Sequence, residues 1–358
     1  MINSTKPEGE EPRTQVNPGK HPGDSETTAT VRKPRGRGRR KILIITQEID
    51  PHADLMALRL QKRGIKAVRF HPQAIGRGDT LTCEFGPRGQ CRWQLAGAYG
   101  VLRDRDVGSV WYRRPLFALD PDLSGDDAQF AQAETREALL GLFRLTEAFW
   151  VNRPDALRVA ESKPMQLKLA QQLGFKVPRT LISNDPQRFR EFYEQCHGGV
   201  IFKVLVQGPL GASQGKGVYT TLVRPEHLQN LETIRRVPCL FQEHVPKALD
   251  LRVTVIGEQV FPVEIHSQDQ AASQIDWRKG DACDLKHARH RFPAKVEKQC
   301  LALVKNFNLE FGAIDLILTP QGEYVFLEIN PSGQFAWIEA LTKLPLVDTL
   351  ADLLLSHT

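Results

Sequence analysis

Residues 311–335, FGAIDLILTPQGEYVFLEINPSGQF, restrict the fold of this 358-residue chain more than any other stretch. Two runs rich in apolar, β-branched and aromatic residues flank the turn-forming TPQG, which predicts an antiparallel β-hairpin. Asp315, Glu328 and Asn330 interrupt these runs. Because side chains alternate along a strand, the three can converge on one face. Such a cluster of oxygen ligands is typical of Mg²⁺ with nucleotide phosphates. The alternative is a hairpin whose polar residues only face water.

The net charge of the chain is concentrated near its N-terminus. Residues 1–41 hold ten basic and five acidic side chains, so five of the chain's six net positive charges lie there. The remainder is nearly neutral, which argues against a polycationic nucleic-acid binder. Residues 1–40 are poor in large apolar groups and are expected to form a disordered basic tail. Within it, VRKPRGRGRRK is a candidate contact for nucleic acid or an acidic partner, unless it is simply solvated.

Composition and cysteine spacing predict a soluble, cytoplasmic protein. The apolar fraction of 41% and the charged fraction of 25% are ordinary for a globular protein. Six cysteines are scattered without a CxxC pair, and we find neither a signal peptide nor a long apolar segment. We therefore expect reduced thiols and no membrane association.

The folded part is predicted to open with a β–α–β unit. Residues 41–46, KILIIT, indicate a buried strand, followed by an amphipathic helix over 50–63 and a strand over 65–70. The expected apolar anchors of this helix are Leu55, Leu58 and Leu60. The order favours a Rossmann-like sheet, but no GxGxxG follows the first strand, so dinucleotide binding is not supported.

Basic residues mark several candidate anion sites. A predicted strand over 107–114 ends in Arg113 and Arg114, whose guanidinium groups suit a carboxylate or phosphate unless they form a surface turn. Residues 276–291 are dense in charge, which favours a loop lining an anion, with a solvated loop as the alternative. A helix predicted over 156–174 carries Lys163 in its first turn.

A strand lysine, Lys203, precedes the Gly-rich segment 208–217, GPLGASQGKG. Phosphate binding needs this combination of a point charge and backbone N–H groups free to approach oxygens. The segment is not a Walker P-loop, because Gly217 stands where Ser or Thr is required, and no HRD or DFG supports a protein kinase. Taken alone, the segment is better explained as an ordinary flexible hairpin.

The order of these features resembles that of ATP-grasp ligases. In sequence order they are Lys163, Lys203 with its Gly-rich loop, Glu243, Val245, Asp250, Arg252, Arg278, Asp315, Glu328 and Asn330. Within the superfamily, VWYRRP, SKPMQLKLAQQLGFKVPRT, LRVTVIG, IDWR and LEINPSGQFAWIE are most similar to the peptide-modifying ligases of microviridin-type (graspetide) pathways. The chain is also similar to ribosomal-protein glutamate ligases. The resemblance runs from Lys41 nearly to the C-terminus.

The resemblance implies a mixed α/β ATP-grasp fold and a set of site residues. The expected domains are the tail (1–40), a Rossmann-like pre-ATP-grasp domain (41–150), a central lid (151–245) and a C-terminal domain with the metal site (246–358). The implied ATP-binding residues are Lys163, Lys203, Gly215, Gly217, Gln242, Glu243, Val245 and Asp250. The implied Mg²⁺ ligands are Asp315, Glu328 and Asn330. The implied catalytic residues are Arg252 and Arg278, and the implied substrate-binding residues are Arg113, Arg114 and Arg291. Asp276 is a candidate general base.

The implied activity is an ATP-dependent carboxylate ligase. It would activate Asp or Glu side chains of a ribosomal precursor peptide, made of a leader and an acidic core, as acyl phosphates. Ser, Thr or Lys side chains would then attack to form macrocyclic esters or amides. The alternatives are a ligase joining a free amino acid to a protein or small acid, and a non-catalytic nucleotide-binding regulator. The resemblance also implies a homodimer, whereas the basic tail and Val204 after Lys203 depart from the family pattern.

Overall fold

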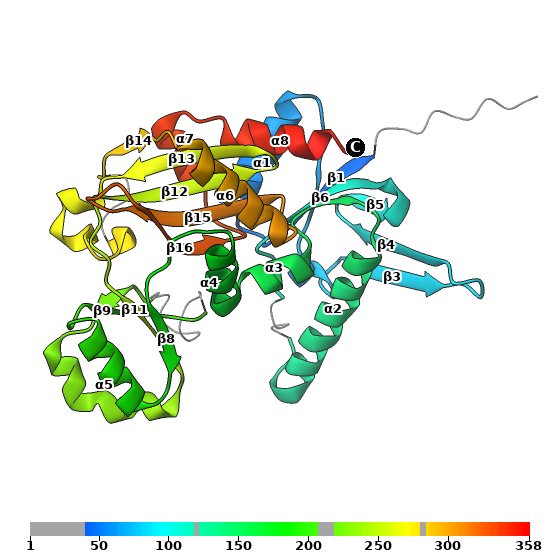
Figure 1. Ribbon diagram of the computed structural model, residues 1–358. Coiled ribbons are helices and arrows are strands. Elements are labelled where there is room, and N and C mark those ends of the chain that lie inside the picture. Colours follow the sequence, from blue (N-terminus) through cyan, green and yellow to red (C-terminus); the bar gives the residue numbers. More distant parts are fainter. Residues whose placement is uncertain (1–39, 118–121, 207–217, 280–283) are drawn as a thin grey trace, which may run out of the picture. The chain divides into compact units, whose positions relative to one another are not determined.

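The computed structural model describes residues 40–117, 122–206, 218–279 and 284–358. In these ranges the chain forms four β-sheets with flanking helices (Figure 1). None of the helices found there is both long and apolar enough to span a bilayer. Residues 1–39, Gly215 and Gly217 lie outside the described residues, so the predictions made for them stay predictions.

The first sheet is parallel, with strands in the order β2-β1-β6-β7. These strands are β1 (Lys41–Thr46), β2 (Val68–Phe70), β6 (Val107–Arg113) and β7 (Phe149–Val151). Strands β1 and β6 are buried almost throughout, as expected for a parallel sheet covered on both faces. Helix α1 (Pro51–Lys62) connects β1 to β2 and begins after Asp50, whose carboxylate accepts a hydrogen bond from the His52 N–H at 3.0 Å. The β–α–β prediction is confirmed.

The apolar face predicted for α1 is largely wrong. Its buried residues are Ala53, Met56 and Leu60, whereas Leu55 and Leu58 are exposed. The true buried stripe is spaced by three and four residues and contains a small alanine. A search for large side chains therefore misplaces the buried face.

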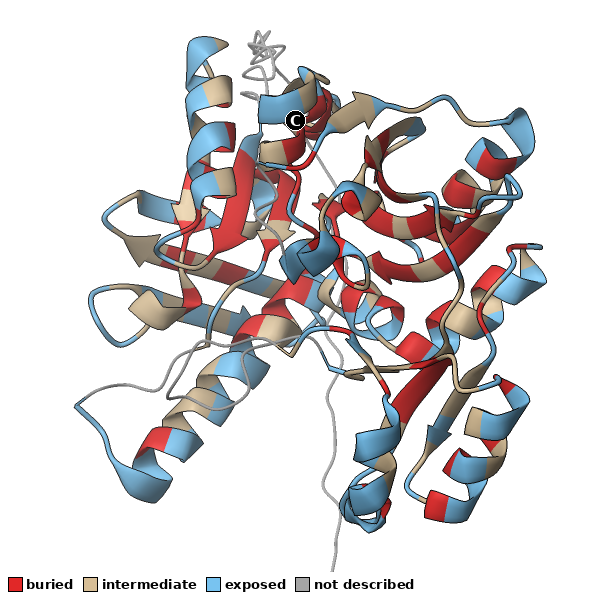
Figure 2. Ribbon diagram, turned by 90° about the vertical axis from the view of Figure 1, so that its left-hand side faces the viewer, coloured by how far each residue is buried: buried red, intermediate tan, exposed pale blue. Residues whose placement is uncertain are grey.

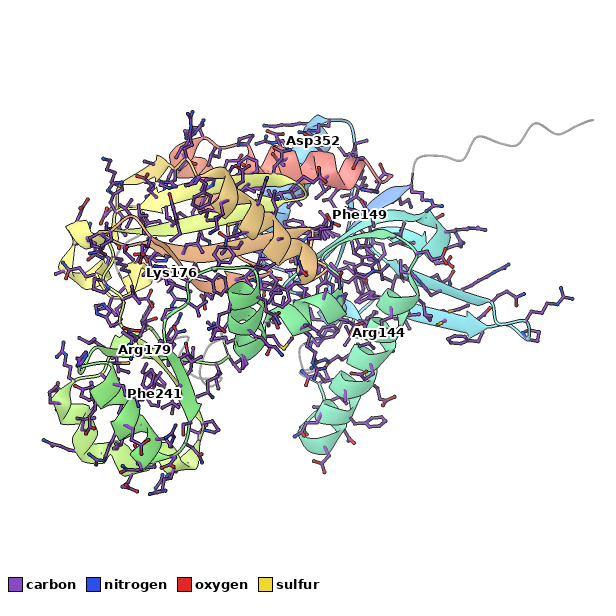
Figure 3. The ribbon with its side chains drawn as sticks, in the orientation of Figure 1. Arg144, Phe149, Lys176, Arg179, Phe241 and Asp352 are labelled. Atoms are coloured by element: carbon purple, nitrogen blue, oxygen red, sulfur yellow. The ribbon has the colours of Figure 1, made fainter. Side chains whose placement is uncertain are left out.

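The N-terminal region also contains an antiparallel sheet of β3 (Thr80–Phe85), β4 (Cys91–Gly97) and β5 (Gly100–Arg103). Helix α2 (Gly125–Leu145) buries Leu139, Leu142 and Phe143 in the same core as Trp93 and Leu95. Near its end, Arg144 contacts Asp155 at 2.8 Å, and Phe149 on β7 stacks on His357 with ring centroids 3.7 Å apart (Figure 3). The first contact fastens the end of α2 to the chain just after β7, and the second fastens the C-terminus to the first sheet.

The single helix predicted over 156–174 is in fact two helices. Helix α3 (Pro154–Ala160) ends before Glu161, and α4 (Lys163–Gln172) starts two residues later. Pro164 has no N–H and restricts the residue before it, so it favours a new helix start over a continuous helix. Lys163 is consequently the first residue of α4, buried at the start of that helix.

The central sheet is antiparallel, in the order β10-β9-β11-β8. Its strands are β8 (Thr180–Ser183), β9 (Val200–Lys203), β10 (Thr221–Leu222) and β11 (Cys239–Glu243). Helix α5 (Pro186–Gln195) packs Phe189 against Phe241, with ring centroids 4.2 Å apart (Figure 3). Leu240 and Gln242 take the other face, and Lys203 shares it because it pairs directly with Leu240.

The last sheet is antiparallel, in the order β14-β13-β12-β15-β16. Its strands are β12 (Leu249–Ile256), β13 (Gln259–Ile265), β14 (His287–Arg289), β15 (Phe311–Leu318) and β16 (Tyr324–Asn330). Helix α6 (Ala294–Asn306) covers one face, where Leu251, Leu316 and Phe326 are buried. Helices α7 (Ala336–Thr342) and α8 (Leu346–Leu355) follow, and α8 joins Ile256, Phe311 and α1 in a second core. Buried residues lie mainly on the strands, whereas much of the helix surface is exposed (Figure 2). The β15–β16 hairpin confirms the prediction that opened the sequence analysis.

Candidate active site

Asp315, Glu328 and Asn330 meet on one face of the β15–β16 hairpin. Asp315 pairs with Glu328, and Asn330 pairs with Ala313, two residues before Asp315. Directly paired residues share a face, so all three side chains project together. The Asn330 amide donates hydrogen bonds to Asp315 Oδ2 at 3.1 Å and to Glu328 Oε1 at 3.2 Å. The predicted convergence of these residues is confirmed.

A β-bulge makes this convergence possible. The register shifts between Asp315 and Leu316: Leu316 pairs with Phe326, whereas Asp315 pairs with Glu328. Leu327 is therefore an extra residue in β16. In a ladder without this bulge, Asp315 would pair with Leu327, and the Glu328 side chain would point toward the core under α6.

Two buried cations balance the paired carboxylates. Arg252, which faces Asp315 across β12 and β15, donates Nη1 hydrogen bonds to both of its oxygens at 2.9 Å. Lys163 forms an ion pair with Glu328. Burial raises the pKa of Asp315 despite the charge of Arg252. Burial would also raise the pKa of Glu328, but Lys163 and Lys203 outweigh it and lower that pKa, so Glu328 is ionised.

An open pocket adjoins these carboxylates. Its lining combines residues of the central and the last sheet. They are Lys203, Thr220, Asp250, Leu251, Ile275, Asp276, Trp277, Arg278, Asp315, Leu316, Leu327 and Glu328. Burial and the charge of Lys163 lower the pKa of Lys203, while the charge of Glu328 opposes this shift. The pocket thus places two cations, Lys203 and Arg278, with four carboxylates, two of which are Asp315 and Glu328.

Arg278 lies in the short 3₁₀ helix Trp277–Lys279 and is held by Asp276. The guanidinium donates from Nε to Asp276 Oδ1 at 2.8 Å and from Nη2 to Oδ2 at 2.7 Å. This pairing raises the pKa of Arg278. On the other side of the turn, the ring of Trp277 lies 5.4 Å from that of Trp337 on α7.

The residues predicted to bind the nucleoside differ in their burial and in their hydrogen-bond partners. Asp250 is buried and accepts hydrogen bonds from Lys247 at 2.6 Å and from Ser267. Gln242, at the end of β11, is buried with no hydrogen-bond partner for its amide oxygen among the described residues. Glu243 ends β11, and its backbone N–H donates to the Arg179 carbonyl at 2.9 Å. Val245 is half-buried just beyond.

The arginines predicted to bind substrate do not lie together. Arg113 is buried, and both Arg113 and Arg114 donate hydrogen bonds to the Ser332 carbonyl, the latter at 2.8 Å. They therefore meet the loop that directly follows Asn330. Arg291 is exposed between β14 and α6 and is not one of the residues that line the pocket. The structure thus brings two of the three predicted residues to the loop after Asn330.

Two buried amides that support this site were not predicted from the sequence. Gln166 of α4 donates to the carbonyls of Ala160 (2.6 Å) and Ile329 (2.9 Å), and it accepts from the Ile329 N–H at 3.2 Å. Asn152, after β7, donates to the carbonyls of Phe311 and Pro331 and accepts from the N–H groups of Glu310 and Phe311. The roles of Gln166 and Asn152 depend on contacts with residues far away in the sequence, which local sequence patterns do not reveal.

The candidate metal set is suited to a hard cation. Two carboxylates and an amide share one buried face, which is the oxygen-rich chemistry that Mg²⁺ prefers. Within the described ranges, no group of three or more His, Cys, Asp or Glu side chains is arranged to hold a metal. The fit therefore depends on Asn330 as the third donor, together with oxygens that a bound phosphate would supply.

Comparison with known families identifies the family of the chain. Residues 41–158 match the MvdD pre-ATP grasp domain, and residues 160–354, more than half of the chain, match the RimK-like ATP-grasp domain. The chain belongs to the RimK-like ATP-grasp family. This RimK-like protein is thus an ATP-grasp ligase with a mixed α/β fold, as the sequence predicted.

Similar structures and sequences include several ligases. A RiPP-associated ATP-grasp ligase of Chryseobacterium gregarium, in complex with ADP and a leader and core peptide, is 30% identical with a TM-score of 0.81, covering 89% of this chain and 97% of that one. The macrocyclase MdnC from Microcystis aeruginosa, bound with precursor peptide MdnA, is 31% identical with a TM-score of 0.79, covering 88% and 99%. A probable alpha-L-glutamate ligase of Histophilus somni is 27% identical over 227 residues, 61% of this chain and 72% of that protein.

Proposed function

We propose that this RimK-like ligase forms macrocyclic ester or amide crosslinks within a ribosomal precursor peptide. The observation that carries the proposal is the pocket in which Lys203 and Arg278 face Asp315 and Glu328. The similarity over nearly the full length to a ligase solved with ADP and with leader and core peptides supports it. The substrate would be an acidic core carried behind a leader.

The reaction joins two anions, so charge neutralisation is its central problem. A carboxylate oxygen of a peptide Asp or Glu attacks the γ-phosphorus of ATP, and the bond to the β–γ bridging oxygen breaks to release ADP. A Ser or Thr hydroxyl, or a Lys amine, then attacks the acyl carbon. Phosphate leaves, a proton is lost, and the peptide is lighter by one water per bond. Arg278 and Arg252 would stabilise the acyl phosphate and the oxyanion.

The donor chemistry of Asp315, Glu328 and Asn330 fits Mg²⁺. Bound there, the ion would neutralise phosphate charge as a Lewis acid. Lys163 and Lys203 would contact the phosphates, because both already lie near Glu328. The unpartnered amide oxygen of Gln242 would accept from the exocyclic amine of adenine on the face it shares with Lys203.

The peptide carboxylate would enter beside the loop after Asn330. Arg113 and Arg114 contact Ser332 there, and the buried Nε of Arg113 has no hydrogen-bond partner among the described residues. That Nε lies 3.8 Å from Asp50 Oδ2 in a buried ion pair, and two adjacent guanidinium groups favour a bound anion. We therefore place the acidic core between these arginines and Arg252, which donates from Nη2 to the nearby Gln334 carbonyl at 3.3 Å.

Mass spectrometry tests the proposal directly. The purified chain is incubated with ATP, Mg²⁺ and the short acidic peptide encoded beside its gene. We expect the loss of one water per crosslink and no change without ATP. Glu328→Gln should abolish crosslinking, because it removes a carboxylate from the candidate metal set. Glu323→Gln is the matched control, because Glu323 lies at the turn of the same hairpin and its side chain forms an ion pair with the exposed Lys176. An unchanged peptide mass alongside ATP binding would contradict the proposal.

The sequence relatives named as glutamate ligases favour a second candidate, the addition of a free amino acid. The same assay separates the two functions when glutamate is added. A gain of one glutamyl residue on a protein or peptide would support this alternative, whereas a loss of water supports crosslinking. A homodimer and a cytoplasmic location also stay predictions, and sedimentation of the purified chain would test the homodimer.

A further inference from the structure

We propose that Asp276 is a positioning residue that fixes both cations of the pocket, Arg278 directly and Lys203 through strand β10. This inference rests on the proposed function only in the role given to Arg278. It differs from the sequence-based prediction, in which Asp276 is a candidate general base. The inference is based on four hydrogen bonds to the Asp276 carboxylate and on the burial of that carboxylate.

The contacts of Asp276 divide between two parts of the fold. Its Oδ1 accepts from the Arg278 backbone N–H at 3.1 Å and from Arg278 Nε at 2.8 Å. Its Oδ2 accepts from Arg278 Nη2 at 2.7 Å and from the Thr220 backbone N–H at 2.9 Å. Arg278 belongs to the loop after β13, whereas Thr220 directly precedes β10 of the central sheet. One carboxylate thus joins the two walls of the pocket.

This arrangement leaves Asp276 little capacity to act as a base. Each carboxylate oxygen already accepts two hydrogen bonds, which matches its usual number of lone pairs. Burial would raise the pKa of Asp276, but its bonds to Arg278 and Thr220 outweigh burial and lower it. The side chain of Asp276 is only 3% exposed, whereas that of Arg278 is 41% exposed. The buried Asp276 therefore orients Arg278, which is exposed enough to contact the substrate.

Strand β10 extends the effect of Asp276 to Lys203. Thr221, next to Thr220, pairs with Phe202, the neighbour of Lys203 on β9. Both Thr220 and Lys203 line the pocket beside Glu328. The loss of the bond from Thr220 to Asp276 would loosen the two-residue strand β10 at its start, and with it the edge that supports Lys203. Asp276 should therefore affect ATP affinity by a route that does not involve Arg278.

A double-mutant cycle separates these two routes. We measure turnover as crosslinking rate, and ATP affinity as binding of a non-hydrolysable ATP analogue without peptide. Asp276→Asn should lower kcat by about tenfold to 100-fold, since misplacement of a catalytic group by about 1 Å has effects of that order. It should also weaken binding of the analogue. Arg278→Ala should lower kcat while leaving analogue affinity largely intact.

In the Arg278→Ala background, Asp276→Asn should leave the remaining kcat unchanged and still weaken analogue binding. Equal losses of kcat in both backgrounds would overturn the positioning role and favour direct chemistry by Asp276. Unchanged analogue affinity would overturn the link through Thr220. Asp269→Asn, an exposed aspartate in the same loop, is the matched control.

Folding of each variant is checked by its thermal midpoint. If Asp276→Asn does not fold, Asp276→Glu keeps the charge but moves it by one methylene, and the same two readouts apply. The analogue-binding measurement needs no peptide. It therefore decides the link to Lys203 even where crosslinking of a precursor peptide fails and the proposed function is wrong.

Discussion

At the scale of single residues, His52 connects helix α1 to the start of helix α7. Its Nε2 accepts the backbone N–H groups of Phe335 at 3.1 Å and Ala336 at 3.2 Å, at the start of α7. A neutral imidazole is required, because a protonated Nε2 would point a hydrogen at two donors. Burial and Arg113 lower the pKa of His52 to about 4, Asp50 opposes this shift, and Arg114 adds to it.

We predict that the free energy of unfolding falls as pH decreases from 6.5 toward 4. The unfolded chain protonates His52 near 6.5, whereas the folded chain resists until about 4. Folding therefore loses up to about 1.4 kcal/mol per pH unit in that window. Urea unfolding at several pH values measures this slope. His52→Gln keeps an acceptor that does not titrate, so its slope should be shallower; an identical slope would show that His52 is not responsible.

Asn152 is the second residue whose role is structural and precise. Its amide makes four hydrogen bonds to the backbone on both sides of the carboxylate hairpin. Asn152→Ala should lower the free energy of unfolding by about 2–4 kcal/mol, because it leaves several buried backbone groups unpaired. Asn306→Ala, at an exposed position of α6, serves as the control and should change stability little. Chemical denaturation compares the two variants.

At the scale of elements, α4 stabilises the hairpin at the position where the metal set lies. Gln166 binds both backbone groups of Ile329, the residue between Glu328 and Asn330. Because β16 is the outer strand of its sheet, this contact supplies partners that no neighbouring strand provides. The helix break at Pro164 allows α4 to approach β16 at its own angle.

We predict that Gln166→Ala weakens Mg²⁺-dependent nucleotide binding as well as stability. The expected loss in free energy of unfolding is about 1–3 kcal/mol, from the unpaired amide and carbonyl of Ile329. Gln171→Ala, exposed on the same helix, removes an equal side chain without that contact. Calorimetry of nucleotide binding with and without Mg²⁺ compares them. A loss of stability with unchanged binding would limit Gln166 to a structural role.

At the scale of the whole molecule, local sequence patterns predicted the helices and strands better than they predicted the contacts between them. The β15–β16 hairpin and the β1–α1–β2 unit follow from apolar periodicity and turn residues in the sequence. The buried face of α1 was not predicted, because it depends on a packed alanine. The helix break before Lys163 was not predicted either, because it depends on a single proline. The ion pairs of Lys163 and Arg252 were also beyond reach, since each joins residues far apart in the chain.

Charge distribution leads to a prediction about the N-terminal residues. Deleting residues 1–39 removes most of the basic side chains of the tail, whereas the first strand begins at Lys41. We expect unchanged unfolding free energy and unchanged ATP binding, with weaker salt-dependent retention on an anionic resin. Loss of crosslinking in the deleted protein, with ATP binding intact, would instead assign these residues to peptide recognition.

The extra residue at Leu327 has a consequence for comparing and engineering such ligases. The turn from Thr319 to Gly322 should accept insertions of either an odd or an even number of residues, because it lies beyond the last residue pair of the β15–β16 ladder. Between Tyr324 and Glu328, only changes of an even number of residues preserve the direction of the carboxylate. An alignment gap of one residue there would separate active from inactive relatives even where every acidic residue is retained.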